Sequence, residues 1–145
     1  MESNLAETTL KNLKDRLSWA LFSLRLGVFI VMFVWVLDKF VHPTHGAKVL
    51  KAFYSIDGVP VEAVYAMGLV QLVVVLMFLA GYAKRISYGL VLAMHGASTL
   101  ISFPKYLAPF DGLLFFAAWP MLAACIALYL LRDEDTRFTF TGTSK

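Results

Sequence analysis

Long apolar stretches separated by short polar connections make up most of the chain. Four of them are predicted to be membrane-spanning helices, at residues 17–41, 61–83, 86–103 and 113–131. Each is close to the ~20 residues with which an α-helix crosses a ~30 Å hydrocarbon layer. The pattern therefore predicts an all-α protein, an integral membrane four-helix transmembrane bundle.

The polar segments at the two ends extend this picture. Residues 1–16 form the predicted N-terminal segment, an amphipathic surface helix in which Asn4 caps the start together with Glu7, three positions later. A frayed polar arm is the alternative. Residues 132–145 are expected to be a mobile cytoplasmic tail, so that the membrane domain covers residues 17–131.

The connections between the spans carry turn and helix signals. Pro43 and Gly46 should end the first helix, and residues 47–54 are predicted to form a short helix in the outer loop. Asp111 is placed to cap the fourth span, and Pro120 should kink it. The basic connection at residues 83–86 is short, which predicts a tight hairpin of the second and third spans.

Charge and composition set the orientation and exclude some functions. Hydrophobic residues make up 59% of the chain, and its mean hydropathy is +0.70. Placing both termini in the cytoplasm puts eight lysines and arginines inside and four outside, which the positive-inside rule favours. The eight are Lys11, Lys14, Arg16, Lys84, Arg85, Arg132, Arg137 and Lys145, and the four are Lys39, Lys48, Lys51 and Lys105. Because these bases mark span ends, nucleic acid is not an expected partner.

The first span is charged at both ends. Its uninterrupted apolar run, residues 26–37, measures only about 18 Å as a helix, so either Arg25 or the pair Asp38 and Lys39 must enter the membrane. Arg25 could reach lipid phosphates, or it could pair internally with a carboxylate such as Asp133. An outer charge cluster could line a site or only fix helix ends; its members are Asp38, Lys39, Glu62, Lys105 and Asp111.

Polar side chains within the second and third spans are the candidates for ligand binding or proton relay. They are Gln71, His95, Ser98, Thr99 and Ser102. The last four follow helical spacing and form one face, and Gln71 lies at a similar depth, so we expect Gln71 and His95 to face each other. His95 could serve as a structural hydrogen bond, a proton carrier, a cofactor contact or a metal ligand.

A second metal candidate is the pair His42 and His45, with Asp57 or Glu62 as further ligands, although a metal is the least favoured reading. The single Cys125 excludes an internal disulfide. The sequence contains none of the common hydrolase or nucleotide-binding motifs, so we expect no catalytic activity from the chain alone.

The chain resembles the DoxX-like (DoxX/DoxD) family of small four-span bacterial membrane proteins at several residues. They are Arg25 with Gly27, Lys39, Gly81 with Lys84 and Arg85, and the stretches that begin at Tyr88 and Leu113. Gln71 stands where that family often has glutamate, and Val36 where it often has glycine. The resemblance implies a bacterial inner-membrane protein with links to quinone or thiol redox chemistry, and a quinone is the one cofactor that it suggests.

The favoured function is therefore an accessory or small subunit of a membrane redox assembly. The alternatives are a small-solute or proton carrier that acts as an oligomer, and a structural protein that organises lipid. The expected partners are the lipid bilayer and either a larger membrane protein complex or further copies of the chain.

Overall fold

The computed structural model describes residues 1–140, with the side chains of all but Glu2 and Ser3. Every regular element in these residues is a helix. The α-helices are α1 (Glu2–Val41), α2 (Pro43–Tyr54), α3 (Val61–Leu79), α4 (Lys84–Ile101), α5 (Phe103–Tyr106) and α6 (Ala118–Leu130). Two 3-10 helices, η1 (Pro109–Asp111) and η2 (Leu113–Ala117), lie between α5 and α6. The all-α prediction is confirmed.

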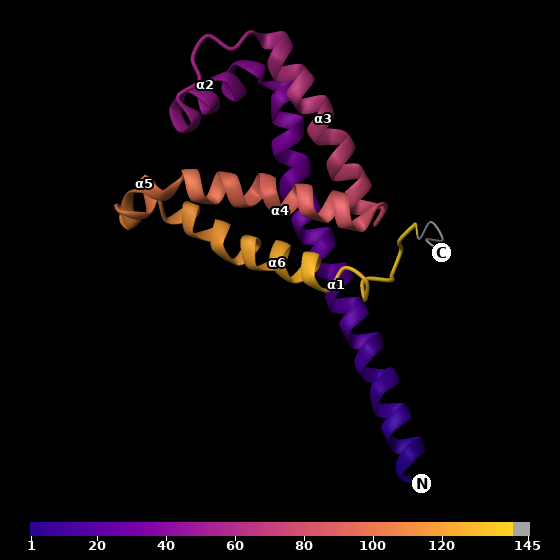
Figure 1. Cartoon of the computed structure of the whole chain (residues 1–145). Coiled ribbons are helices and arrows are strands. Elements are labelled where there is room, and N and C mark those ends of the chain that lie inside the picture. The colour runs from indigo at the N-terminus through magenta and orange to yellow at the C-terminus, as the bar shows by residue number, and fades with distance from the viewer. Residues whose placement is uncertain (141–145) are drawn as a thin grey trace.

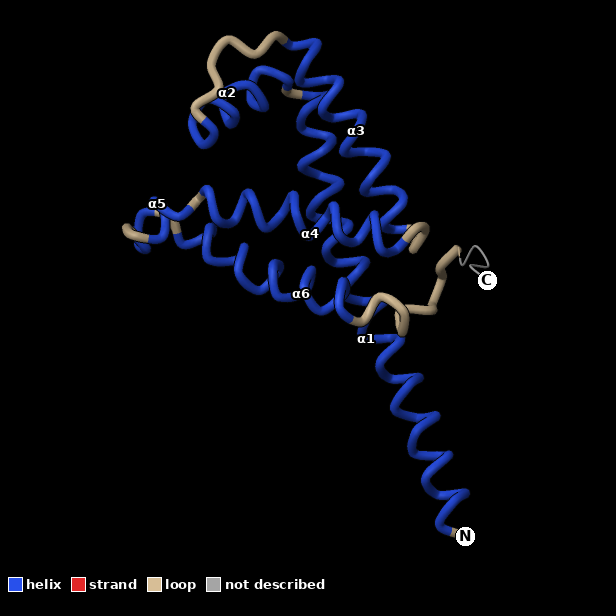
Figure 2. The backbone as a smooth tube through the Cα atoms, in the orientation of Figure 1, coloured by secondary structure: helices blue, strands red, loops and turns tan. Residues whose placement is uncertain are grey.

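The long helices pack in two antiparallel pairs that run in clearly different directions (Figure 1). We call α1 with α3 the first arm and α4 with α6 the second arm. The arms meet near the turn between α3 and α4, and they diverge from there (Figure 2). This arrangement differs from the predicted bundle, in which all four helices run side by side.

The turn between α3 and α4 explains how the chain changes direction. Gly81 has a φ of +60°, and the amide of Tyr82 donates to the carbonyl of Met77 at 3.0 Å. A glycine in this conformation, with that hydrogen bond, is the common way to end a helix. Ala83 follows with a φ of +44°, so α4 leaves the turn in a new direction.

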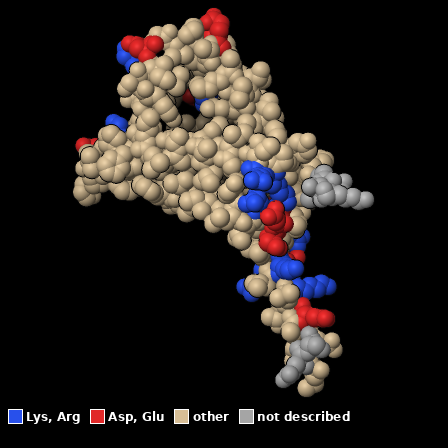
Figure 3. All heavy atoms as spheres, viewed as in Figure 1, with Lys and Arg blue, Asp and Glu red and all other residues tan. Residues whose placement is uncertain are grey.

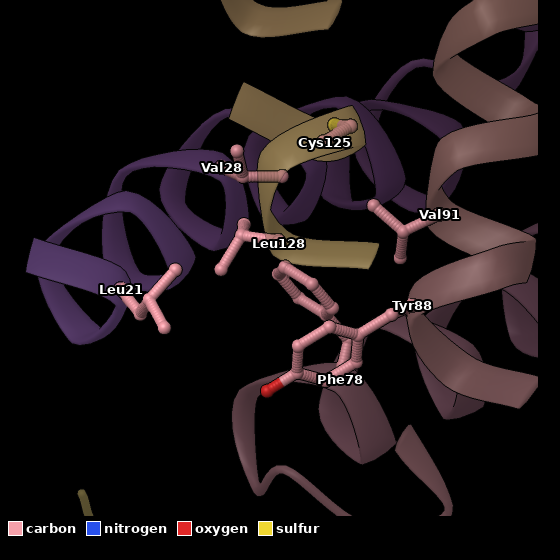
Figure 4. Close-up of a cluster of buried hydrophobic side chains, with 7 residues drawn as sticks. All are labelled: Leu21, Val28, Phe78, Tyr88, Val91, Cys125 and Leu128. Carbon is pink, nitrogen blue, oxygen red and sulfur yellow. The ribbon is translucent and has the colours of Figure 1, made fainter. Parts of the chain in front are cut away.

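The buried apolar core lies where the arms meet. It combines side chains from all four long helices, namely Leu21, Val28, Phe78, Tyr88, Val91, Cys125 and Leu128 (Figure 4). The rings of Phe78 and Tyr88 pack edge to face, with their centroids 4.9 Å apart. Away from this core many large apolar side chains are exposed, including Trp35 and Val70 on the first arm.

Three segments are long and apolar enough to cross a membrane, judged by length and composition. They are Asn4–Val41, Val61–Leu79 and Leu113–Leu130. α4, predicted as the third span, is not among them. It begins with two basic residues, Lys84 and Arg85, and it carries His95 among several hydroxyl side chains.

α1 is one continuous helix of 40 residues, without the predicted boundary after residue 16. The prediction that Asn4 caps a separate helix is wrong, because α1 begins at Glu2 and Met1 makes no side-chain cap. The carbonyl of Asn4 instead accepts a hydrogen bond from the Thr8 hydroxyl at 2.8 Å. Residues 2–41 contain no proline, so nothing in the covalent chain interrupts the helix.

The fourth predicted span also begins differently. Asp111 lies in η1 and does not cap α6, whose N-cap is Ala117. Pro120 falls in the first turn of α6, directly after η2, where a missing amide hydrogen removes no helical bond, so it lies at the start of α6 and not within a continuous helix as predicted. The short helix predicted over residues 47–54 is confirmed as α2, but α2 begins at Pro43 and contains Gly46, so only Pro43 acts at the end of the first helix.

Candidate functional site

The most unusual site in the fold is a buried charged cluster at the junction of the arms. Arg25, in α1, has no exposed side-chain surface, and its Nη1 lies 3.2 Å from Oδ2 of Asp135. The Tyr88 hydroxyl completes a triangle: it accepts from Arg25 Nη1 at 3.2 Å and donates to Asp135 Oδ2 at 2.7 Å. We call these three side chains the buried triad.

Asp135 belongs to a segment that folds back across the helices, residues 132–140, which we call the C-terminal strap. Arg25 Nη2 donates to the backbone carbonyl of Arg137 and, at 3.4 Å, to that of Phe138. Lys84 Nζ donates to the carbonyl of Asp135 at 2.6 Å. Two cations from two helices therefore hold the strap by its backbone.

The electrostatics of the cluster are only partly balanced. Burial lowers the pKa of Lys84, and the nearby Asp135 carboxylate opposes part of that shift. Arg25 Nε and Asp135 Oδ1 are buried without a hydrogen-bond partner among the described residues. Removing one partner of a buried ion pair strongly destabilises the fold, because the other partner is left charged and unsolvated.

Side chains of the strap add further contacts to α1. The guanidinium of Arg137 lies 4.1 Å from the centre of the Trp19 ring, and its Nε donates to Ser18 Oγ at 3.1 Å. Arg137 also pairs with Asp15. The ring of Phe138 packs on that of Phe22, with a centroid distance of 5.0 Å. These contacts hold the strap where it crosses α1.

The strap is also fastened to the turn between the arms. The amide of Phe140 donates to the carbonyl of Ala80 at 2.8 Å. A Cβ atom at Gly81 would lie 2.5 Å from Thr139 and 2.8 Å from Arg25 Nη1, so only glycine fits there. The glycine that turns the chain thus also leaves room for the strap.

The buried triad decides between the two sequence interpretations of Arg25. Internal pairing is correct, and the snorkelling alternative is wrong, because the side chain is fully buried. The partner is Asp135 and not Asp133, which is exposed. The prediction of a mobile tail is wrong for residues 132–140, and residues 141–145 lie outside the described part of the chain. The roles of Tyr88 and Lys84 were missed.

Within the second arm, His95 on the predicted polar face of α4 contacts α6, and the hydroxyls of that face bond to α4 itself. His95 Nε2 lies 3.0 Å from the carbonyl of Ala118 in α6, and since a carbonyl only accepts, Nε2 carries the hydrogen. The hydroxyls of Ser98 and Thr99 donate to the carbonyl of His95, at 3.1 and 2.8 Å. Ser102 donates to Ser98 in the same manner, at 2.8 Å. His95 therefore joins α4 to α6.

Gln71 does not share this site. It lies half-buried on α3, in the first arm, and its side chain makes no hydrogen bond within residues 1–140. The structure thus gives His95 a different partner from the predicted one. The reason is that α3 and α4 diverge from the turn that joins them. Residues at equal distances from that turn therefore belong to different helix pairs (Figure 1).

The predicted outer charges are divided between the ends of the two arms. Asp38 contacts Nδ1 of His45 at 2.5 Å and Nδ1 of His42 at 3.3 Å, and Lys39 donates to the carbonyl of Trp35 at 3.1 Å. Glu62 is exposed in the first turn of α3. Lys105, in α5, and Asp111, in η1, lie at the end of the second arm.

The histidine pair does not gather the ligand set that a metal requires. Asp57, the proposed third ligand, pairs with Lys51 at 2.7 Å, and this hydrogen bond lowers the pKa of its carboxyl. Within the part of the chain that the structure describes, no group of three histidine, cysteine or acidic side chains could hold a metal ion. His42 and His45 instead share the carboxylate of Asp38.

Comparison with known proteins adds no relative. No protein-family model, curated protein or solved structure matches the chain. Function must therefore be inferred from the helices, the buried triad and the exposed surfaces.

Proposed function

We propose that the chain is an integral membrane protein that acts as a non-catalytic partner subunit of a larger membrane assembly. The observation that carries this proposal is the apolar surface left exposed on both arms. Trp35 and Val70, on the first arm, are 60% and 65% exposed, and Leu100 and Leu130, on the second, are 64% and 67% exposed. Apolar surface of this extent marks contact with lipid or with another protein.

The buried polar groups favour a binding role over catalysis or transport. Arg25, Tyr88 and Asp135 bind one another, and His95 and Thr99 bind backbone carbonyls. A carrier needs interior polar groups that are available to its solute, and these are already used to hold the helices and the strap. The divergence of the arms also leaves helix faces to which neighbouring helices could pack.

The nature and location of the assembly rest on the sequence. The family resemblance suggests a redox assembly linked to quinone or thiol chemistry in a bacterial inner membrane. The distribution of lysine and arginine favours cytoplasmic termini. In this proposal the chain contributes apolar helix surface, while the redox groups belong to its partners.

The test is purification of the full chain from its native membrane in a gentle detergent, with mass spectrometry of co-purified proteins and quinones. We expect defined partner proteins, and alkaline carbonate should leave the chain in the membrane fraction. Ala66→Trp and Ala123→Trp place a bulky apolar group on exposed positions of α3 and α6. They should reduce partner recovery while membrane retention is unchanged, because close helix approach requires small side chains.

Two outcomes would overturn the proposal. Release of the wild-type chain by carbonate would exclude membrane integration. Recovery of the wild-type chain without partners, together with proton or solute flux in liposomes, would favour the carrier.

A further inference from the structure

A groove forms where the C-terminal strap crosses α1. Its volume is about 690 Å3, and its lining residues are Lys11, Asn12, Lys14, Asp15, Ser18, Thr136, Arg137 and Phe138. Positions 11 and 14, 15 and 18, 11 and 15, and 14 and 18 are three or four residues apart, so the four positions share one face of the helix. The strap supplies the opposite wall.

The groove is positively charged. Its lining contains three bases and one acid, and the acid, Asp15, pairs with Arg137. Lys11 and Lys14 make no ion pair within the described residues, so their two charges are not neutralised there. Asn12 and Thr136 add hydrogen-bond donors to the same lining. Lysine ammonium groups next to amide and hydroxyl donors form a suitable environment for a phosphate.

One wall of the groove is apolar. The Phe138 side chain is 72% exposed, although its ring also packs against Phe22 and lies 6.4 Å from the Trp19 ring. Aromatic side chains of this kind favour the boundary between hydrocarbon and headgroups. Charged atoms gather here on α1 and at the start of the strap, whereas the visible surface of the arms is mostly uncharged (Figure 3).

From this combination we infer that the groove binds the headgroup of an anionic phospholipid. Its phosphate contacts Lys11 and Lys14, and its first hydrocarbon segment lies against Phe138. Basic pockets between helices at the membrane surface bind such lipids in general, and a phosphate without a hydrocarbon chain would leave Phe138 unused. The inference rests on the membrane location proposed above, but not on any partner protein.

The test uses the delipidated full chain in a non-ionic detergent, titrated with equal amounts of phosphatidylglycerol and phosphatidylcholine of the same acyl chains. Native mass spectrometry counts the lipids that each protein retains. We expect preferential retention of phosphatidylglycerol by the wild type. Lys11→Gln and Lys14→Gln should each reduce that preference about fivefold, the factor that one lysine near an anionic surface contributes.

Matched variants distinguish a specific lipid-binding site from non-specific attraction of the anionic lipid to lysine charges. Lys48→Gln with Lys105→Gln removes the same charge from two exposed lysines of other elements, and it should leave the preference unchanged. Phe138→Ala should weaken phosphatidylglycerol retention, whereas Phe140→Ala, which truncates a side chain that is 75% exposed, should not. Far-ultraviolet circular dichroism confirms that each variant is folded.

The result that would overturn the inference is equal retention of the two lipids by the wild type, or an equal loss of the preference in the double variant Lys11→Gln, Lys14→Gln and in the double variant Lys48→Gln, Lys105→Gln. Displacement of phosphatidylglycerol by an equal concentration of glycerol phosphate would instead identify a site for free phosphate compounds. Because the titration is done in detergent with the isolated chain, its failure would leave the proposed membrane subunit role standing. Failure of the co-purification would likewise not affect the lipid result.

Discussion

Asp135→Asn is expected to release the C-terminal strap. The substitution preserves the size of the side chain and an oxygen that can accept from Tyr88, but it removes the negative charge that lies 3.2 Å from Arg25 Nη1. Both side chains of the ion pair have no exposed surface. Breaking a buried pair of this kind leaves an uncompensated charge, at a cost of about 3–5 kcal/mol.

That magnitude distinguishes the ion pair from ordinary polar contacts in membrane proteins, which average only about 0.6 kcal/mol. A loss of about 3 kcal/mol corresponds to roughly a hundredfold increase in the population of the open strap. Trypsin can report this population at the bond after Arg137, because cleavage follows the open fraction when reclosing is faster than cutting. We therefore expect the Asp135→Asn protein in detergent to lose residues 138–145 roughly a hundredfold faster than the wild type.

Asp133→Asn is the matched control, since it makes the same chemical change two residues away at an exposed position. It should be cleaved at the wild-type rate. The double variant Arg25→Met, Asp135→Leu should recover part of the protection, because an apolar pair avoids burying a lone charge, although it loses the hydrogen bonds from Arg25 to the carbonyls of Arg137 and Phe138. Equal cleavage rates in Asp135→Asn and Asp133→Asn would refute the view that the buried triad holds the strap.

Three other substitutions test separate contacts, each by the detergent unfolding midpoint or the same trypsin assay. Tyr88→Phe should destabilise the fold by about 1.5–3 kcal/mol, the range for hydrogen bonds to charged groups, and a cost below 0.5 kcal/mol would show that the hydroxyl is dispensable. His95→Ala should cost about 1 kcal/mol by removing the bond to the Ala118 carbonyl, and an unchanged midpoint would disprove that link. Gly81→Ala should speed cleavage of the strap, because its Cβ has no room and its φ is +60°. Gly27→Ala, with open space around it, should not, and similar rates for both would remove the steric argument.

The helices themselves were largely predictable from the sequence. Hydrophobic stretches predicted the long helices, three of which are long and apolar enough to cross a membrane, and Pro43 correctly marked the end of α1, because these signals are local. The short apolar run after Arg25 also indicated that this charge could enter the membrane, and internal pairing was one of the two interpretations that it left open. Local signals of this kind depend on neighbours in the chain and not on tertiary structure.

The partners of polar residues were not predictable in the same way. Whether Arg25 pairs with Asp135 or with Asp133 depends on how residues 131–136 turn. Whether His95 contacts α6 or Gln71 in α3 depends on the angle between the arms. That angle is set by Gly81 and Ala83, whose positive φ values the sequence did not reveal. The continuous helix over residues 2–41 was missed because the polar segment and the apolar segment were treated as separate elements.

The contact between Arg25 and the strap has a consequence for biosynthesis. The carbonyl of Arg137 that Arg25 binds lies 112 residues further along the chain. At typical translation rates of about 5–20 residues per second, Arg25 leaves the ribosome on the order of ten seconds before its partners. During that interval its charge must be solvated by water or lipid headgroups. The junction of the two arms can therefore close only after Asp135 and Arg137 have been made, so a ribosome that stalls before Asp135 would leave a product with its helices formed and without the carboxylate that pairs with Arg25.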